Sequence, residues 1–217
     1  MLYADKHVML RSRQTSGKRI PIRPELQAAL LDAGTLHLRD RPHTNLTLRS
    51  LAKVSGVSHT TAAAQFGSMP GYLSALATRS WTALLAKLRH TPVEVVSLGL
   101  AYIEFAIEHP HAFRLMNDPG LWSTDLTASG VPADLQRPVV AARAAAFDLF
   151  VKAVKQGQAD GSLRAGDSRL VARMPAALAH GLALELIDRS GRPGPEHHVH
   201  LGEAKEVLYL GMLGLVA

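Results

Sequence analysis

A glycine, Gly56, separates two short stretches that each have the apolar spacing of a helix. Thr47 is a good N-cap for the first stretch, in which the apolar residues between Leu48 and Val54 share one face. Gly56 stands where the chain must turn sharply, and Ser58 can cap the second stretch, which ends near Gln65. The pattern predicts a helix-turn-helix, whose second helix enters a DNA major groove while the first crosses the backbone.

The residues around this turn resemble those of the TetR family of transcriptional regulators. The resemblance extends from Arg23 to about Leu88 and rests on the spacing of Thr47, Ala52, Gly56-Val57-Ser58 and Phe66. It implies an N-terminal DNA-binding domain, a linking helix and a helical C-terminal domain that encloses a small-molecule site. In the family, the last two helices pair with their copies in a symmetric dimer.

Two positions depart from the family pattern. The family usually has an aromatic residue three positions before the Phe, where this chain has Ala63, and a Lys three positions after it, where this chain has Met69. Both family residues commonly contact phosphates. The departures favour an alternative function, that of a dimeric small-molecule-binding protein of the same fold that has lost sequence-specific DNA binding.

A second resemblance lies in the C-terminal half. The run from Tyr102 to Met116 looks like the pocket helices of one TetR-type C-terminal domain class, which is named for a Trp-His-Gly motif on a later helix. The matching run in this chain is Ala179-His180-Gly181, with Ala in the Trp position. The resemblance implies that these helices enclose an effector.

The composition favours an all-α protein. Hydrophobic residues make up 47% of the 217 residues but aromatic residues only 5%, and abundant Ala and Leu favour helices over a sandwich or barrel. The chain has no cysteine, which fits a cytoplasmic protein and excludes disulfides and thiolate zinc sites. We expect no membrane span, and the stretch from Met1 to Pro24 lacks the apolar core of a signal peptide.

Charge is distributed unevenly along the chain. The first 90 residues carry 13 Lys and Arg against 4 Asp and Glu, whereas the rest carry 11 against 14. A basic N-terminal half suits a module that binds phosphates, because neutralised phosphates release counterions. A solvated basic tail without a partner is the alternative explanation for part of this charge.

We expect four segments along the chain. They are a flexible basic arm over 1–22, a helix-turn-helix domain over 23–70, a linking helix over 71–91 and a helical effector-binding and dimerisation domain over 92–217. Apart from the helix-turn-helix, the apolar spacing and the Pro and Gly positions predict helices at about Pro24–Arg39, Met69–His90, Pro92–Glu108, Pro110–Met116, Pro138–Ala159, Ser168–Arg189 and His200–Val216. Ser168 is the expected N-cap of the penultimate helix.

Polar residues of the helix-turn-helix are candidates for contacts with double-stranded DNA. Short polar side chains and a glutamine on the second helix suit direct readout of base edges, and cations on the first helix would bind phosphates. The candidate DNA-binding residues are Thr47, Arg49, Lys53, Ser58, His59, Thr60, Thr61 and Gln65. An exposed polar surface without a DNA partner is the alternative.

Apolar residues at helical spacing in the C-terminal half are expected to point inward, and one histidine stands among them. The candidate ligand-binding residues are Tyr102, Phe105, Phe113, Met116, Phe147, Phe150, Met174 and His180. Such a stripe also fits an ordinary core, and His180 also fits a buried, hydrogen-bonded core histidine. The resemblance to the family favours a pocket for a small molecule.

The last two predicted helices are apolar around much of their surface, so part of that surface must be covered. Burial within one subunit and burial against a second copy are both possible. The candidate dimer-interface residues are Leu178, Leu182, Leu186, Leu208, Met212 and Leu215. A symmetric dimer would match a palindromic operator.

No motif in the chain points to catalysis. A serine-centred elbow, a phosphate-cradling glycine loop and a cysteine nucleophile are all absent from the sequence. The histidine-rich run Glu196–His200 is the one metal-like cluster, and closely spaced histidines in a loop make a poor closed site. We therefore expect no catalytic residues, no metal and no cofactor.

These observations predict an all-α, homodimeric transcriptional regulator. The expected partners are double-stranded DNA with a palindromic operator, a small and mainly apolar effector, and a second copy of the chain. We expect the protein to be a repressor that the effector releases from DNA.

Overall fold

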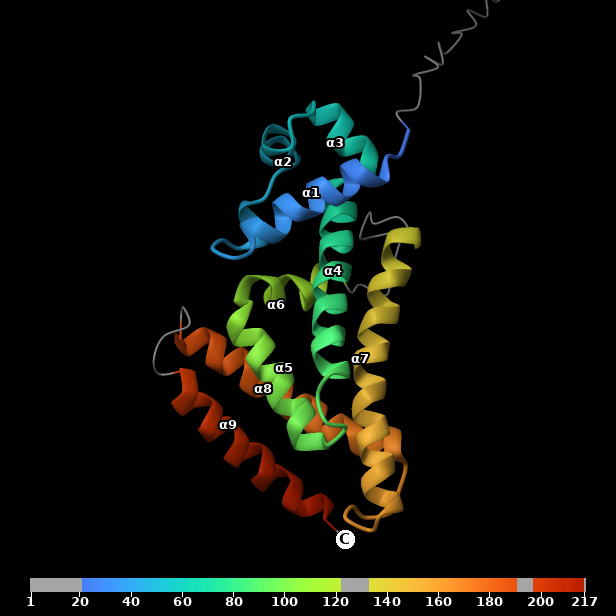
Figure 1. Ribbon diagram of the computed structural model, residues 1–217, viewed down its shortest axis with the longest axis vertical. Helices are drawn as coiled ribbons and strands as arrows, with labels where there is room; N and C mark the ends of the chain where they lie inside the picture. Colours follow the sequence, from blue (N-terminus) through green and yellow to red (C-terminus); the bar gives the residue numbers. More distant parts are fainter. Residues whose placement is uncertain (1–20, 122–132, 191–196, 217) are drawn as a thin grey trace, which may run out of the picture.

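The computed structural model describes residues 21–121, 133–190 and 197–216, and regular secondary structure in these residues is helical. An isolated β-bridge joins Leu163 and Val216. The elements, labelled in Figure 1, are α1 (Pro24–His37), η1 (His43–Asn45), α2 (Leu48–Val54), α3 (His59–Phe66), α4 (Met69–Arg89), α5 (Val95–Glu108), α6 (Pro110–Met116), η2 (Pro119–Leu121), α7 (Ala133–Ala159), α8 (Ser168–Ser190), α9 (His197–Met212) and η3 (Leu213–Leu215). The predicted all-α fold is confirmed.

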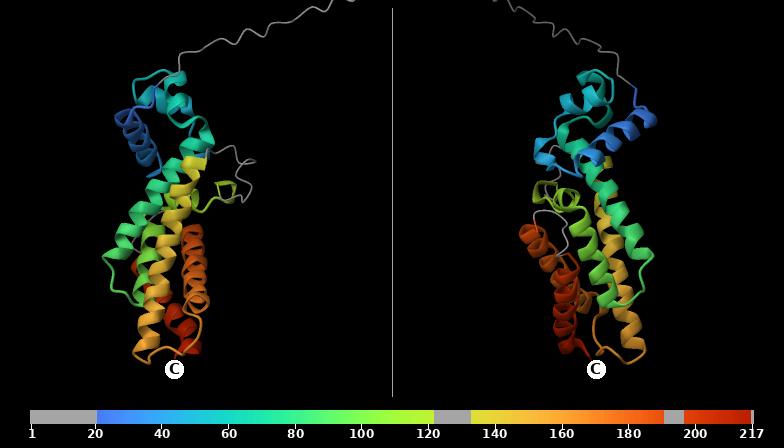
Figure 2. Two further views of the ribbon diagram at one scale, coloured as in Figure 1. Left: turned by 90° about the vertical axis from the view of Figure 1, so that its right-hand side faces the viewer. Right: turned by 60° about the vertical axis from the view of Figure 1, so that its left-hand side comes forward.

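Helices α1, α2 and α3 form a head at one end of an elongated molecule, and the remaining helices form the body (Figure 1). Helix α4 runs from the head into the body and packs along α7. Helix α8 packs against α5 and α7, and α9 covers the outer side of α5 and α8. Figure 2 shows the long helices of the body running roughly along the length of the molecule.

A tyrosine at the start of α4 joins the head to the linking helix. Tyr72 is fully buried, its ring packs edge-on against Phe66 of α3 at a centroid distance of 5.1 Å, and its hydroxyl donates to the Leu30 carbonyl at 2.9 Å. Gly34 is the residue of α1 that faces this hydroxyl, and a Cβ at that position would lie 1.9 Å from it. The head is therefore built tightly around the first turn of α4.

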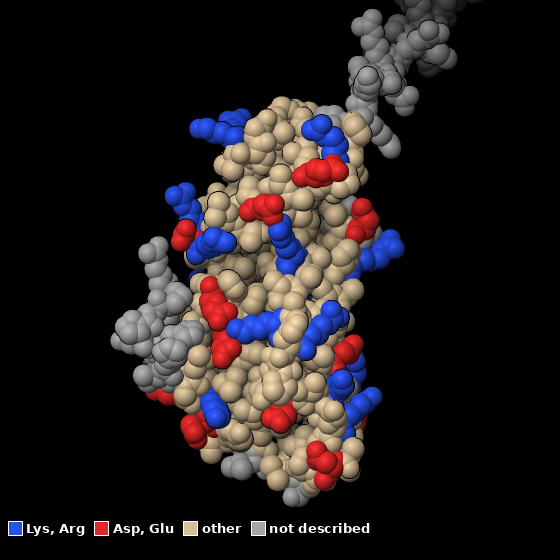
Figure 3. Space-filling view, viewed as in Figure 1, with Lys and Arg blue, Asp and Glu red and all other residues tan. Residues whose placement is uncertain are grey.

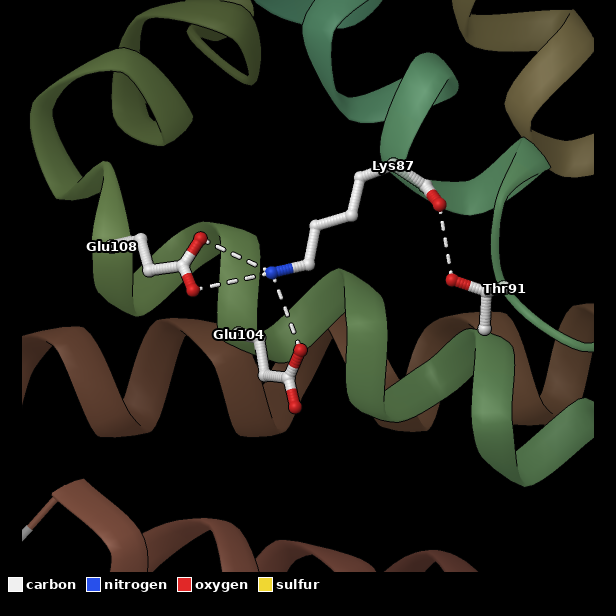
Figure 4. Close-up of polar contacts among 4 residues, drawn as sticks. All are labelled: Lys87, Thr91, Glu104 and Glu108. Atoms are coloured by element: carbon white, nitrogen blue, oxygen red, sulfur yellow. Dashed lines mark hydrogen bonds and ion pairs between the residues drawn. The ribbon is translucent and has the colours of Figure 1, made fainter.

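The other end of α4 is joined to α5 by an ion-pair cluster (Figure 4). Lys87 Nζ lies 3.2 Å from a Glu104 carboxylate oxygen and 3.1 Å from a Glu108 carboxylate oxygen. The Thr91 hydroxyl donates to the Lys87 carbonyl at 3.0 Å, which satisfies a backbone group at the end of the helix. Two carboxylates on successive turns of α5 thus hold one cation of α4.

Three helix starts differ from the prediction. Helix α7 begins at Ala133 and contains Pro138, whereas the sequence favoured Pro138 as the first residue, because proline is common there. Asp167 caps α8, since its Oδ1 accepts from the Arg169 amide at 2.8 Å, and the predicted cap, Ser168, donates to Gln158 instead. Helix α9 begins at His197 rather than near His200.

Some predictions fall outside the described part of the chain. They concern residues 1–20 of the basic arm, Trp122 and the rest of the loop up to residue 132, and Glu196 of the histidine-rich run.

Candidate nucleic-acid interface and ligand pocket

The turn between α2 and α3 has the predicted local geometry. The Thr47 hydroxyl accepts from the Ser50 amide at 3.1 Å, and the Ser58 hydroxyl accepts from the Thr61 amide at 3.1 Å, so both predicted N-caps are confirmed. Gly56 has a φ of +66°, which is the left-handed conformation that glycine adopts without strain. These local bonds satisfy backbone donors at the start of both short helices.

Helix α3 presents a small polar surface at its N-terminal end. Ser58, His59 and Thr60 are exposed, and Thr61 is half-buried with its hydroxyl 2.8 Å from the Ser58 hydroxyl. Ala62 is fully buried on the opposite side of the helix. His59 and Thr60 are therefore free of the core and available to a groove of DNA.

Gln65 does not belong to this surface, and its predicted role in reading bases is wrong. Its side chain is 3% exposed, its Oε1 accepts from the Arg23 amide at 2.8 Å, and its Nε2 donates to the Pro21 carbonyl at 3.1 Å. Gln27 in turn donates to the Gln65 carbonyl at 2.8 Å. The glutamine holds the start of α1 against α3, a role that depends on residues about 40 positions away in the chain.

The first helix of the motif carries cations beside this surface. Arg49 and Lys53 are exposed on α2, and Thr47 is exposed at its N-terminus with its hydroxyl engaged in the cap. Figure 3 shows Lys and Arg side chains at the end of the molecule formed by the head, and charges of both signs intermixed over the body. This arrangement can place cations on phosphates while α3 faces the bases.

The body contains a partly open cavity of about 280 Å³. Its wall is mostly apolar and comes from α4, α5, α7 and α8, with Asn117 immediately after α6. The lining residues are Trp81, Tyr102, Asn117, Arg143, Ala146, Phe147, Phe150, Ala176, Ala177 and His180. Four of the predicted ligand-binding residues line it, namely Tyr102, Phe147, Phe150 and His180.

The polar end of this cavity is a neutral pair. Tyr102 Oη lies 2.9 Å from His180 Nδ1. Burial raises the pKa of Tyr102, and burial together with the positive charge of Arg143 lowers the pKa of His180. The phenol therefore keeps its proton and the imidazole stays uncharged at neutral pH.

Two predicted pocket residues lie behind the wall instead of in it. Phe113 is fully buried, with its ring centroid 5.3 Å from that of Tyr102 and 5.7 Å from that of His180. Met116 is also fully buried, and its carbonyl accepts from Trp81 Nε1 at 2.9 Å. Both residues support the side chains that line the cavity.

Two further predicted pocket residues lie away from the cavity. Met174 is 43% exposed on the outer side of α8, so its predicted inward position is wrong. Phe105 lines a smaller cavity of about 190 Å³ between α1, α4 and the α5–α6 corner, together with Arg39, Arg79 and His109. The sequence missed three lining residues, Trp81, Asn117 and Arg143. Trp81 stands on the apolar stripe of the linking helix, which favoured an ordinary core role, and the polar Asn117 and Arg143 belong to no apolar stripe.

Residues 95–198 match the family model described as the Tetracyclin repressor-like, C-terminal domain. The C-terminal half of the chain is therefore similar to that of TetR-family regulators. This confirms the resemblance seen in the sequence, whereas membership of the Trp-His-Gly class stays a prediction. No curated protein matches the chain.

Solved structures with the same fold include several of TetR-family regulators. A protein of unknown function from Rhodococcus sp. RHA1 is 27% identical, with a TM-score of 0.66 over 88% of this chain and 96% of that one. The TetR family transcriptional regulator PfmR from Thermus thermophilus is 18% identical, with a TM-score of 0.59 over 84% and 96%. The transcriptional regulator FadR from Bacillus subtilis, solved in complex with stearoyl-CoA, is 13% identical, with a TM-score of 0.64 over 87% and 98%.

The TetR-family resemblance placed the dimer interface on α8 and α9, but the residues chosen for it mostly face inward. Their positions follow the apolar stripe that packs on α5. Buried within the subunit are Leu186, Leu208, Met212 and Leu215, while Leu178 and Leu182 are half-buried against the core. The prediction that these four buried residues form a dimer interface is therefore wrong. Each of the two helices has two apolar faces, and the four residues lie on the face that packs into the core of the same subunit.

The outer faces of α8 and α9 carry a second apolar stripe. Its large side chains are from 36% to 66% exposed, and along each helix the exposed residues recur every three or four positions. The exposed stripe consists of Leu170, Met174, Ala177, Gly181 and Leu184 on α8, Val207 and Leu210 on α9, and Gly214 just after α9. A side chain at Gly181 would meet open space, so nothing within the subunit requires a glycine there.

Together with its core face, this stripe makes α8 strongly apolar. Among the described residues, Ser168–Arg189 is the one helical stretch long and apolar enough to cross a membrane. The expected absence of a membrane span stays a prediction. Because α8 packs against α5 and α7 on its inner side, its apolar character follows from a core face added to an outer stripe.

Proposed function

We propose that this protein is a cytoplasmic, homodimeric repressor of the TetR family, whose α3 helices read a palindromic operator and which a small, mainly apolar effector releases from DNA. The observation that carries the proposal is the exposure of His59 and Thr60 at the start of a correctly capped α3, beside Arg49 and Lys53. A TetR-family fold is that of a DNA-binding transcriptional regulator.

Direct readout is assigned to the N-terminal end of α3. The Thr60 methyl can contact a thymine methyl, and His59 can donate to or accept from a base edge. Arg49 and Lys53 would bind phosphates. Ser58 and Thr61 are kept for the cap, so they support the reading surface through its backbone.

Dimerisation is assigned to the exposed stripe of α8 and α9. A four-helix interface needs apolar residues every three or four positions on each helix, and this spacing is present on the outer faces. A glycine inside a helix costs about 1 kcal/mol relative to alanine, and Gly181 offsets that cost if a partner helix approaches closely there. Two-fold symmetry then sets two α3 helices against two half-sites roughly 34 Å apart.

We assign binding of the effector, which releases the protein from DNA, to the cavity of the body. Trp81 of α4, Tyr102 of α5 and Asn117 after α6 line it together, so an occupant contacts the linking helix and the α5–α6 unit at once. The FadR structure with stearoyl-CoA shows that a protein of this fold can be solved with an apolar-tailed ligand. We expect two states of the dimer, one with its heads spaced to fit the operator and one that does not fit. An effector that binds the second state more tightly would shift the population toward that state by its differential affinity.

The decisive experiment is a selection of genomic fragments with the purified protein. We expect a recovered palindrome whose half-sites lie one helical turn apart. The variants His59→Ala and Thr60→Ala should each weaken binding to it by about 5- to 150-fold, the range for loss of one good base contact. The control is Gln65→Ala, which should lower the melting temperature, whereas the two surface variants should leave it unchanged.

The salt dependence of binding separates the proposal from its rival. Ala63 and Met69 are half-buried in the described structure, so α3 and the start of α4 lack the family's usual phosphate contacts at these positions. A protein that has lost operator binding would enrich no palindrome and would show a flat response to salt on any fragment. A regulator should show a steep negative slope, which Arg49→Ala or Lys53→Ala should each reduce by about one.

A further inference from the structure

The cavity of the body has one charged side chain in its described lining, the exposed Arg143 of α7. His180, which also lines the cavity, is uncharged at neutral pH. The other polar groups of the lining are the Tyr102 hydroxyl and the Asn117 amide. A cationic ligand would be repelled at this site, and an anionic one would be attracted.

The charge of Arg143 is felt inside the cavity. Its positive charge contributes to the lowered pKa of His180 and acts against the burial that raises the pKa of Tyr102. Arg143 therefore stands within electrostatic reach of the neutral Tyr102–His180 pair. In the tautomer in which His180 Nδ1 donates to Tyr102 Oη, the single hydroxyl proton is left to donate to an anion held by the guanidinium.

The rest of the lining is largely aromatic. Phe147 and Phe150 follow Arg143 on the same face of α7, one and two turns along. Trp81 of α4 adds a third ring, whose N–H is already bound to the Met116 carbonyl. Alanine side chains of α7 and α8 complete the lining. At about 280 Å³ the cavity lies at the small end of ligand pockets, which favours one or two rings.

We propose that the effector of this cavity is a compact aromatic carboxylate, with its ring between Trp81 and the two phenylalanines and its carboxylate on Arg143. The inference rests on the proposed effector site and adds the chemical class of its ligand. A carboxylate matches the planar fork of one guanidinium. A phosphate monoester or pyrophosphate carries about two charges, and the described lining offers one cation to meet them.

The test uses a carboxylate and its uncharged isostere on the full-length protein. The chain has two tryptophans, so Trp122→Phe leaves Trp81 as the sole indole reporter, and this variant is the parent protein for the measurements. 4-Phenylbutyrate and 4-phenylbutyramide, which share their ring and chain, are titrated against Trp81 fluorescence. We expect the acid to bind at least about tenfold more tightly than the amide, as a charged hydrogen bond warrants.

Arg143→Gln in the same background should bring the affinity of the acid to within about twofold of that of the amide and leave the amide affinity unchanged. The matched control is Arg137→Gln, an exposed arginine of the same helix outside the lining, which should keep the preference for the acid. Equal binding of the two compounds by the parent, an equal loss of both in Arg143→Gln, or no Trp81 response to either compound at millimolar concentration would each overturn the inference. These readouts involve no DNA, so a failed palindrome selection and a failed acid preference are separate results.

Discussion

His43 Nε2 lies 3.1 Å from Asp118 Oδ2, and this contact joins the turn before α2 to the loop after α6. The two side chains are 14% and 33% exposed, and the other Asp118 oxygen accepts from the Gly120 amide at 2.8 Å. Because α6 also packs on η1, the head touches the body here as well as through α4. This contact is thus a second point at which the body holds the head, in addition to α4.

Removing the charge of Asp118 should loosen the second point. Asp118→Asn keeps an oxygen for Gly120 but loses the charge opposite His43. We expect it to lower the free energy of unfolding by about 0.5–1 kcal/mol, as for a partly exposed pair, and to speed amide hydrogen exchange at His43–Asn45. Asp134→Asn, at an exposed site on α7, is the control, and equal exchange rates in the two variants would contradict the assignment.

The fit between Gly34 and Tyr72 predicts a strong mutational coupling. Gly34→Ala should destabilise the protein by about 1–3 kcal/mol, because its Cβ would overlap the Tyr72 hydroxyl. Tyr72→Phe alone should cost about 1 kcal/mol through loss of the bond to Leu30. In the double variant the 1.9 Å overlap disappears and only tight contacts of 3.0–3.1 Å with Leu76 and the Tyr72 ring remain, so urea denaturation should show a loss smaller than the sum. Simple additivity would show that the two residues do not constrain each other.

Neighbouring leucines of α9 should respond in opposite ways. Leu210 is 64% exposed and Leu208 is 1% exposed. Leu210→Glu should convert the dimer to a monomer in light-scattering measurements at micromolar concentration, with little loss of helix content. Leu208→Ala should keep the oligomeric state and cost about 2–5 kcal/mol of stability as a cavity in the core. A dimer that survives Leu210→Glu would place the interface elsewhere.

Acid should destabilise the protein partly through His180. Burial, with help from Arg143, lowers the pKa of His180 below its ordinary 6.5, so the unfolded chain binds a proton that the folded chain does not. The stability from this group is complete above pH 6.5 and is lost as the pH falls through the folded pKa.

His109 and His111 also have lowered pKa values because of burial, so they add to the same loss. His180→Gln should therefore shrink, without abolishing, the drop in melting temperature between about pH 7.5 and about pH 5.5. His59→Gln, at an exposed site, serves as the control. A full-sized drop in the His180 variant would contradict the link.

Local features of the head could be predicted from the sequence because their causes are local. The caps at Thr47 and Ser58 and the turn at Gly56 depend on bonds between residues three positions apart or on one residue's φ. The break between α5 and α6 likewise follows from Pro110. Such features depend on near neighbours in the sequence, so they form in the same way whatever packs around them.

The errors concern side chains whose partners are distant in the sequence. Gln65 is polar and near a helix end, which predicts exposure, yet it binds the backbone at Pro21 and Arg23. Leu208 and Leu210 look alike in a helix that is apolar on two faces, and only the packing of α5 distinguishes them. Arg143 is an exposed charge on α7, and only the packing of α4, α5 and α8 around it shows that it also lines the cavity.

The cluster of Lys87 with Glu104 and Glu108 gives α4 a pivot at the end far from the head. With a rise of about 1.5 Å per residue, Trp81 stands roughly 9 Å from that pivot and Met69 roughly 27 Å from it. A rotation of α4 about Lys87 therefore acts as a lever, in which a displacement of about 1 Å beside the cavity becomes about 3 Å where the linking helix meets α3.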